Sequence, residues 1–438
     1  MMIQRILCWL SFLLLPLIAQ QELTLSESWQ IALQNNLTLQ QQQKVIEQAA
    51  KEWQIQKSQL LPTLTASGSY KYVSELARLQ LPFPVPGVKE IEAGVRNQYD
   101  LSLVFQQPLF TGFRTINMIK SARQQYLAQQ LQETVVRNRL LFQIGQLFYS
   151  IQLNLLQQKV LMESISRTDN HLQQVRNFYL TGQAPAFDTL QVFNRKLQQE
   201  NQLQQVKNTF TILTSQFRHL LNTEQPVKAA PLSIETVNPT LAPLDEYLNR
   251  AQQYRPELQQ FRAVQEGQRF RKNALRSAYY PQVVAMASYH YARPGVDFFR
   301  GEWMDYYTVG VGVKWNLWNW KRDQRKVEQV QVELQRLDLQ HRQILQDIRQ
   351  QVIEAYQYLK NTAQQIQLQQ RLVAQERERY RIVQEQYAQG QASNLDLDNA
   401  ETALTEAELG LQEASIQWYR YSLQLDFATG EIDGGNKK

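Results

Sequence analysis

Residues 179–188 read YLTGQAPAFD, and residues 387–396 read YAQGQASNLD. The two stretches share a tyrosine, a Gly-Gln-Ala turn and an aspartate at the same spacing. Each lies between long segments that are rich in helix-forming residues and nearly free of proline and glycine. A glycine after such a segment is typical of a helix end at which the chain then reverses. The repetition therefore predicts two copies of one antiparallel helical hairpin.

The duplication continues upstream of the hairpins. Ser58-Gln-Leu-Leu-Pro62, followed by Tyr70, recurs as Ser277-Ala-Tyr-Tyr-Pro281, followed by Tyr289. The distance from this motif to the hairpin turn is longer in the first copy, which indicates an insertion there. The segment Pro82-Phe-Pro-Val-Pro86-Gly87 has the composition of a turn-rich loop and is the expected place for it.

The N-terminal segment has the layout of a secretory signal peptide. Arg5 precedes the apolar run Ile6–Leu15, and Ala19 is a small residue suited to cleavage. The only cysteine, Cys8, lies inside the apolar run, so we expect neither a lipid anchor nor a disulfide in the mature protein. The expected organisation is a signal peptide over 1–19, a first repeat over 20–222, a Pro-rich linker over 223–244, a second repeat over 245–430 and a disordered tail over 431–438.

Bulk properties exclude several classes of protein. A mean hydropathy of -0.47 is too polar for a bundle of transmembrane helices. The formal charge of +6 is spread along the chain, without the concentrated basic stripe of a nucleic-acid-binding protein. None of the four histidines has a histidine or carboxylate at metal-ligand spacing, and no nucleophile elbow or phosphate loop is present. We therefore expect no enzyme activity, no cofactor and no metal site.

Residues 114–179 and 322–388 each predict one long helix. Apolar residues of the first recur at the three-and-four spacing of one helix face, at Leu127, Leu131, Leu141, Ile144, Phe148, Ile151 and Leu155. A helix with such a stripe needs a partner helix to cover it. Segments from about Asp188 to Leu221 and from about Asp396 to Phe427 predict the partners.

Four shorter segments alternate between apolar and polar residues, as β-strands do. They span about 62–73, 97–107, 281–292 and 304–318, and four tryptophans lie near strand ends, at Trp303, Trp315, Trp318 and Trp320. Apolar faces with aromatic ends favour a transmembrane β-barrel with an aromatic belt, although a half-buried sheet packed on the helices has the same alternation. Four strands do not close a barrel, and open edges are not tolerated in lipid, so the chain must assemble. Two copies give 8 strands and three give 12; the strand count alone does not choose.

The arrangement of helix, strand pair, long helix, turn and helix, twice after a signal peptide, resembles the TolC-like outer-membrane efflux protein family. The resemblance is carried by Leu61-Pro62, by Gln107-Pro-Leu-Phe-Thr-Gly112 and by the two hairpin turns, and it extends from about Leu23 to Gly430. It implies an α+β membrane protein that forms a homotrimer. In such a trimer, a 12-stranded β-barrel is continued by a periplasmic α-helical barrel, with residues 223–244 in a belt around its middle.

The resemblance also implies a function. The trimer is expected in the bacterial outer membrane, in contact with its lipid, as the exit duct of a tripartite efflux or type I secretion system. Its expected partners are a periplasmic adaptor (membrane fusion) protein and an inner-membrane pump of the RND, ABC or MFS type. The alternative is a secreted or periplasmic coiled-coil scaffold or adhesin without a pore.

Residues at the hairpin turns are the candidate functional residues. By resemblance, Asp188 contacts Tyr387 in a periplasmic gate, Asp396 forms an acidic ring, and Asp398 lies one residue before the second ring position. An arginine that some members use to lock the gate is replaced by Ala392. The turns themselves are expected to dock the adaptor through Gly182, Gln183, Gly390 and Gln391. Simpler roles are open for the same residues, because acids are favoured in a first helical turn and glycines at helix C-termini.

Overall fold

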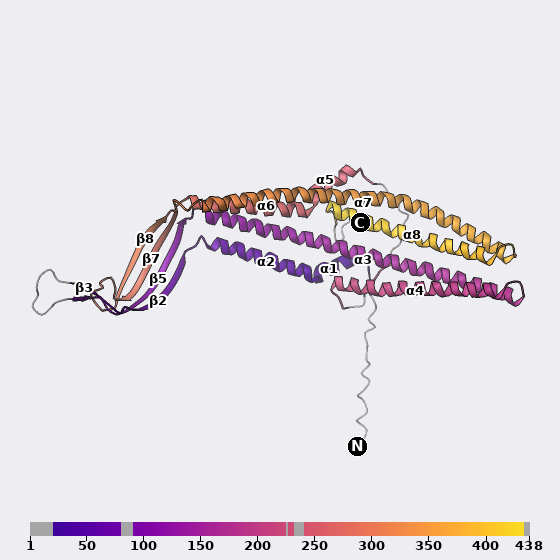
Figure 1. Cartoon of the computed structure of the whole chain (residues 1–438), viewed down its shortest axis with the longest axis horizontal. Coiled ribbons are helices and arrows are strands. Elements are labelled where there is room, and N and C mark those ends of the chain that lie inside the picture. Colours follow the sequence, from indigo (N-terminus) through magenta and orange to yellow (C-terminus); the bar gives the residue numbers. More distant parts are fainter. Residues whose placement is uncertain (1–20, 80–90, 225–226, 232–240, 433–438) are drawn as a thin grey trace, which may run out of the picture. The chain divides into compact units, whose positions relative to one another are not determined.

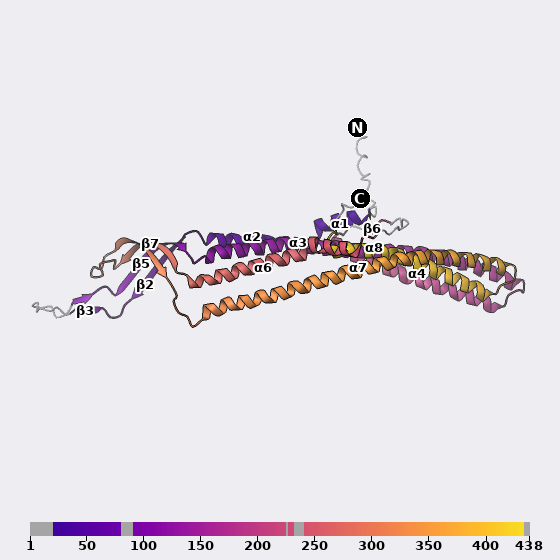
Figure 2. The same ribbon diagram turned by 90° about the horizontal axis from the view of Figure 1, so that it is seen from above.

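The computed structural model describes residues 21–79, 91–224, 227–231 and 241–432. The expected signal peptide and the Pro82–Gly87 segment therefore lie outside the described residues. The chain forms two compact units. One contains residues 42–134 and 256–345, and the other contains the three remaining stretches. The elements of both are labelled in Figures 1 and 2.

The first of these units is built on a four-stranded antiparallel sheet. Its strands lie in chain order, as β2 (Thr63–Tyr72), β5 (Asn97–Phe110), β7 (Gln282–Arg293) and β8 (Met304–Lys314). A small hairpin, β3 (Ala77–Leu79) with β4 (Ile91–Ala93), follows β2. The helices of this unit are α2 (Leu37–Ser58, from residue 42), α6 (Pro256–Leu275), the short η1 (Arg276–Tyr279), and the first parts of α3 (Arg114–Leu180) and α7 (Arg322–Ala388).

The last strand is shorter than the alternating pattern predicts, since β8 ends at Lys314 rather than at residue 318. Lys314 pairs with Gln282, the first residue of β7, and the residue before that is Pro281. Proline has no N–H to donate to a neighbouring strand. The ladder therefore stops there, and the apolar alternation that continues through Trp315 and Leu317 lies outside the sheet.

The two faces of the sheet differ in polarity. One face carries hydroxyl pairs, with 2.8 Å between the side-chain oxygens of Ser67 and Ser102 and 2.7 Å between those of Ser288 and Thr308. The opposite face is apolar yet open, so that the side chains of Tyr307 and Val309 are 78% and 77% exposed. Within the described residues, β2 and β8 each pair on one side only. A single chain thus leaves an apolar face and two sheet edges uncovered.

The second unit contains α1 (Leu25–Asn35), α4 (Ala186–Leu221), α5 (Leu244–Tyr254), α8 (Asn394–Thr429) and the remaining parts of α3 and α7. A short strand, β1 (Gln21–Leu23), pairs in parallel with β6 (Val227–Ala229) from the expected linker. Its core includes Ile144, Phe148 and Phe217, all almost fully buried. The stripe predicted on α3 is buried from Leu141 to Ile151, whereas Leu127, in the other unit, is 41% exposed.

The C-terminal tail is ordered further than the sequence predicts. Ile432 is buried against Leu141 and Leu423, and Glu431 forms an ion pair with Arg250 of α5 at 3.4 Å. The first two residues of the expected disordered segment are therefore part of the fold. None of the helices in the described ranges combines the length and apolar character needed to span a bilayer.

Candidate functional site

The two hairpin turns have the same backbone structure. At the end of α3, the N–H of Gly182 donates to the carbonyl of Tyr179, and the N–H of Gln183 donates to that of Phe178. At the end of α7, Gly390 and Gln391 repeat both hydrogen bonds. This is the Schellman arrangement, which needs a left-handed residue, and both glycines have φ of 74°. No atom outside the immediate chain lies within 4 Å of where a Cβ would stand at either glycine, so the turns face open space.

The matched aspartates that follow the turns differ in role. Asp396 is exposed and closes a capping box, because its carboxylate accepts from the N–H and hydroxyl of Ser393 at 3.0 and 2.6 Å. These hydrogen bonds lower the pKa of Asp396. The corresponding N-cap of α4 is Pro185, which has neither a hydroxyl nor an N–H, so α4 has no side-chain cap. Asp188 is half-buried and takes part in no capping box. Asp396 therefore acts as a helix cap here, while Asp188 is left available for contacts with the other hairpin.

Tyr387 lies between the two hairpins. It is buried beside His171 and Phe178 of α3, with ring centroids 5.3 and 5.5 Å apart. Burial raises its pKa to about 12, and the negative charge of Asp188 contributes in the same direction. The structure thus brings the expected pair of Asp188 and Tyr387 into one electrostatic neighbourhood. Apolar residues from both hairpins pack around them: Leu172, Val175, Val192 and Leu397.

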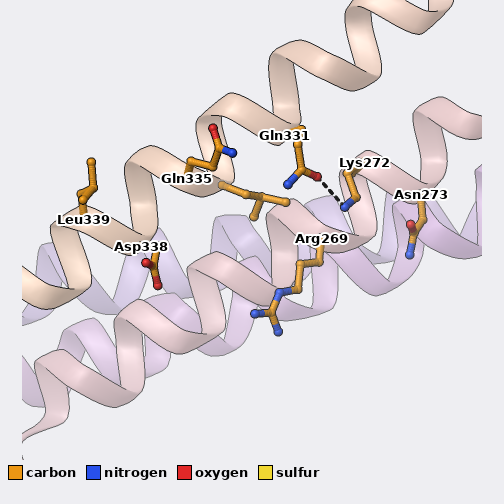
Figure 3. A pocket seen from close by; sticks show the side chains of 8 residues that line it. Arg269, Lys272, Asn273, Gln331, Gln335, Asp338 and Leu339 are labelled. Carbon is orange, nitrogen blue, oxygen red and sulfur yellow. Dashed lines mark hydrogen bonds between the residues drawn. The ribbon is translucent and has the colours of Figure 1, made fainter.

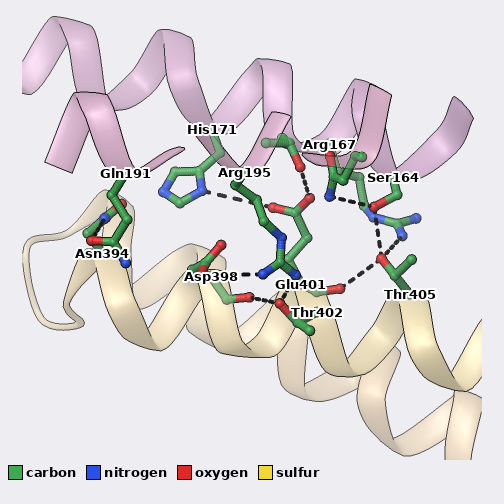
Figure 4. Close-up of polar contacts among 12 residues, drawn as sticks. Ser164, Arg167, His171, Gln191, Arg195, Asn394, Asp398, Glu401, Thr402 and Thr405 are labelled. Carbon is green, nitrogen blue, oxygen red and sulfur yellow. Dashed lines mark hydrogen bonds and ion pairs between the residues drawn. The ribbon is translucent and has the colours of Figure 1, made fainter. Parts of the chain in front are cut away.

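Asp398 joins the hairpins by an ion pair that the sequence did not predict. Its carboxylate lies 3.7 Å from the guanidinium of Arg195 on α4, and the same guanidinium donates to the hydroxyl of Thr402 (Figure 4). Ala392 supplies no cation in this region. Arg195, on the other hairpin, instead connects α4 to α8.

A buried polar cluster lies next to this ion pair. The hydroxyl of Thr168 donates to one carboxylate oxygen of Glu401, and Nδ1 of His171 lies 3.9 Å from the other (Figure 4). The side chains of His171 and Glu401 are each only 2% exposed. Further along, Arg167 donates to Thr405 and Glu408, both at 3.0 Å. The cluster therefore connects α3 of the first hairpin to α8 of the second.

Burial controls the charge of this cluster. It lowers the pKa of His171 below the usual 6.5, although the charges of Asp398 and Asp188 and the amide of Asn394 act in the opposite direction. It raises the pKa of Glu401 above 4.5, against the hydroxyl of Thr168 and the charge of Arg167. Nε2 of His171 and Oε2 of Glu401 have no hydrogen-bond partner among the described residues. Burial therefore disfavours the charged form of each group while the hairpins are packed together.

Sequence reasoning missed His171 and Glu401, because the partners lie on different hairpins. A signal was nevertheless present in the helix periodicity. On α8 the core positions, spaced by four and three, are occupied by Leu397, Glu401, Leu404 and Glu408. On α3 the equivalent series is Ser164, Thr168, His171 and Val175. Charged residues at core positions of two facing helices indicate a buried polar contact.

The tryptophans that were predicted to form an aromatic belt lie at both ends of the sheet. Trp303 precedes β8 and stacks on Tyr291, with ring centroids 4.8 Å apart. Trp315 follows β8, and its indole N–H donates to the carbonyl of Tyr279 at 3.3 Å. Both, and Trp318, are between 42% and 69% exposed, so they are surface aromatics rather than core residues.

Cavities also lie away from the hairpin turns. One of about 620 Å³ lies between α6 and α7, where Lys272 donates to Gln331 at 2.9 Å and Arg269, Gln335 and Asp338 line the walls (Figure 3). Across the described ranges, no group of three His, Cys, Asp or Glu side chains could hold a metal ion.

An exposed apolar sheet face with aromatic ends, combined with paired long hairpins, is the arrangement of an outer-membrane channel that extends into the periplasm. The family of outer membrane efflux proteins matches residues 29–223 and 247–431. The chain belongs to this family.

Solved structures share the fold. VceC of Vibrio cholerae superimposes with a TM-score of 0.78 at 14% identity, over 93% of this chain and 96% of that one. CmeC of Campylobacter jejuni gives 0.76 at 14%, over 94% and 87%. The open state of MtrE of Neisseria gonorrhoeae gives 0.76 at 16%, over 94% and 91%. A comparison with curated protein sequences finds no match.

Proposed function

We propose that this chain forms a homotrimeric outer-membrane exit duct of a tripartite efflux or type I secretion system. The observation that carries the proposal is the sheet, whose apolar face is exposed and whose β2 and β8 edges are both unpaired within the described residues. Pairing β8 of one copy with β2 of the next removes every edge, as a structure in lipid requires. Three copies then give the 12-stranded barrel that resemblance to the family implies, with lipid outside and the hydroxyl-lined face around the lumen.

The hairpin turns are the proposed docking site for a periplasmic adaptor, which in turn contacts an inner-membrane pump of the RND, ABC or MFS type. Large apolar side chains beside the turns support this role. Leu180, Phe187 and Leu395 are 80%, 70% and 54% exposed, which is unfavourable in water and favours a protein partner. Gly182 and Gly390 allow close approach of another backbone, because they carry no side chain there.

The gate is proposed to consist of the contacts between the two hairpins. Arg195 with Asp398 and the buried pair of Thr168 with Glu401 connect the first hairpin to the second, and the charge of Asp188 acts on Tyr387 across the same boundary. Opening the channel at this end requires the hairpins to separate, and each of these contacts opposes that movement.

Conductance of the purified protein in a planar bilayer tests the proposal. The unmodified protein should conduct weakly, and the double substitution Asp188→Ala with Tyr387→Phe should conduct more. Tyr179→Phe is the matched control, because Tyr179 is the repeat-related tyrosine of the first hairpin and is exposed. Absence of conductance from every variant would contradict the channel. Conductance that the double substitution leaves unchanged would remove this pair from the gate and leave the channel standing.

Cell fractionation distinguishes the duct from a coiled-coil scaffold without a pore. The duct should remain in the outer-membrane fraction after carbonate extraction. Release into the carbonate supernatant would favour the scaffold.

A further inference from the structure

A second polar cavity lies where the sheet meets the helices. Its volume is about 490 Å³. It is bounded by the starts of α3 and α7, by the end of α6 with η1, and by the paired strand ends at Gln282 and Lys314. All of these elements belong to one compact unit, so the cavity is complete within a single chain.

The cavity is strongly basic. Five cationic side chains and one carboxylate line it: Arg114, Arg271, Lys314, Arg322, Lys326 and Asp323. Asp323 is nearly buried and lies 3.5 Å from Arg322 and 3.9 Å from Lys326. Within the described ranges, no ion pair reaches Arg114, Arg271 or Lys314 at this cavity. The charge of Arg271 helps to lower the pKa of Glu333, but the carboxylate of Glu333 forms its ion pair with Arg336.

This concentration of charge stands out in a chain whose charges are otherwise spread. The formal charge of the whole chain is only +6, whereas the five cations and one carboxylate of this single cavity give it a local net charge of +4. At about 0.1 M salt the Debye length is roughly 10 Å, so cations that line one small cavity act together on an anion inside it. Arginine forks and lysine ammonium groups are the side chains that bind phosphate and carboxylate.

The strand register shows which face of the sheet the cavity belongs to. Side chains alternate along a strand, so Lys314 of β8 shares a face with Thr308, and Gln282 of β7 shares a face with Ser288. This is the face of the hydroxyl pairs. Val309, Val311 and Val313 lie on the opposite, apolar face. In the proposed trimer the cavity therefore opens toward the lumen rather than toward lipid.

We propose that this cavity is a binding subsite for anionic groups of solutes that pass through the duct, with phosphate, carboxylate or sulfate as the recognised chemistry. Three copies form a basic ring at the junction of the β-barrel and the helical barrel and make the lumen anion-selective there. The inference rests on the proposed trimeric channel. Lipid headgroups carry the same phosphate chemistry, but they would require the cavity to open on the apolar face.

Selectivity measurements in planar bilayers test this subsite. Lys314→Gln and Lys314→Glu change the charge at the cavity, and Lys360→Gln and Lys360→Glu make the same changes at an exposed position further along α7. In a KCl gradient the unmodified protein should favour chloride. Lys314→Glu should lower the chloride-to-potassium permeability ratio by roughly threefold or more, because it alters the lumen charge by two units in each copy. The Lys360 variants should leave the ratio within about 1.3-fold. Equal trimer content of all variants, checked on a gel, excludes a folding defect.

Inorganic pyrophosphate is the probe for binding. It should block the current of the unmodified protein at about 0.1 M KCl, and less at about 1 M, where the Debye length falls to roughly 3 Å. Lys314→Glu should weaken the block. Normal conductance with no pyrophosphate block, or with a permeability ratio indifferent to Lys314, would overturn the subsite and leave the channel intact. Dependence on Lys314 only in bilayers that contain phosphatidylglycerol, without a pyrophosphate effect, would assign the cavity to headgroups and also overturn it. A protein that never conducts would contradict the proposed function itself.

Discussion

Thr168→Val should weaken the contact between the two helical hairpins. Valine has nearly the shape of threonine, so the substitution leaves no large cavity and removes only the hydroxyl that donates to Glu401. The carboxylate is 2% exposed, and its other oxygen already lacks a hydrogen-bond partner among the described residues. Above its pKa Glu401 is a charged acceptor, and leaving such a buried acceptor without a donor costs about 1–3 kcal/mol. A loss of about 2 kcal/mol corresponds to a roughly 30-fold shift in the equilibrium between packed and separated hairpins.

A double-mutant cycle measures the effect. Thermal unfolding and bilayer conductance would be followed for T168V, E401Q and the combination. In the E401Q background, Thr168→Val removes only a neutral hydrogen bond, worth about 0.5–1.5 kcal/mol, so its cost should be smaller there.

Thr362→Val is the matched control for this cycle. Thr362 is also buried, and its hydroxyl donates to a helix carbonyl, that of Tyr358, at 2.7 Å. That carbonyl keeps its helical N–H partner after the substitution, so the control should cost little. If Thr168→Val costs the same with and without the carboxylate, or no more than the control, the hydroxyl–carboxylate contact does not hold the hairpins together.

Further predictions concern protonation, the turns and the caps. Burial keeps the pKa of His171 below 6.5, so the stability that neutral His171 contributes is present above pH 6.5 and is lost as the pH falls. The stability of H171Q should therefore fall less on acidification than that of the unmodified protein. Burial raises the pKa of Glu401, so the stability that protonated Glu401 contributes is present below pH 4.5 and is lost as the pH rises. E401Q lacks this gain at low pH and should therefore lose more stability on acidification than the unmodified protein. A change in acid sensitivity in the same direction for H171Q and E401Q would contradict this reasoning. Gly182→Ala should lower the free energy of unfolding by about 1 kcal/mol through backbone strain alone. Gly112→Ala should lower it more, because the new Cβ would lie 2.7 Å from the carbonyl oxygen of Ser277. Equal unfolding midpoints for the two variants would contradict this difference. Ser393→Ala should cost about 1 kcal/mol by removing the cap of α8, as thermal unfolding would show, and a neutral result would mean that Asp396 has another role.

Repetition and periodicity were sufficient to predict much of this fold. Equal spacing around Gly182 and Gly390 predicted two turns, and the structure gives both the same hydrogen bonds. The sequence also shows that the first helix after each turn begins differently, because Ser393 can cap a helix with its hydroxyl and Pro185 cannot. This difference explains why Asp396 takes part in a capping box and Asp188 does not.

Contacts between distant elements were beyond the sequence. Periodicity places Thr168 and Glu401 at core positions, but it does not show that the two residues pair, because their pairing depends on how two separate hairpins pack. The end of β8 depends on Pro281 in its neighbour, not on its own alternating residues. The basic cavity likewise joins residues from α3, α6, β8 and α7, which lie far apart along the chain.

Disulfide cross-linking between the sheet edges tests the proposed trimer most directly. The only cysteine, Cys8, lies in the expected signal peptide, so introduced cysteines report one contact. Cysteines would be placed in pairs, one at Thr65, Ser67 or Ser69 of β2 and one at Thr308 or Gly310 of β8, to cover the possible registers. These strands are at opposite edges of the sheet within one chain. We predict that at least one pair yields a covalent ladder on a denaturing gel that stops at three copies, because the ring then closes. A ladder that ends at two, continues beyond three or never forms would contradict the 12-stranded barrel.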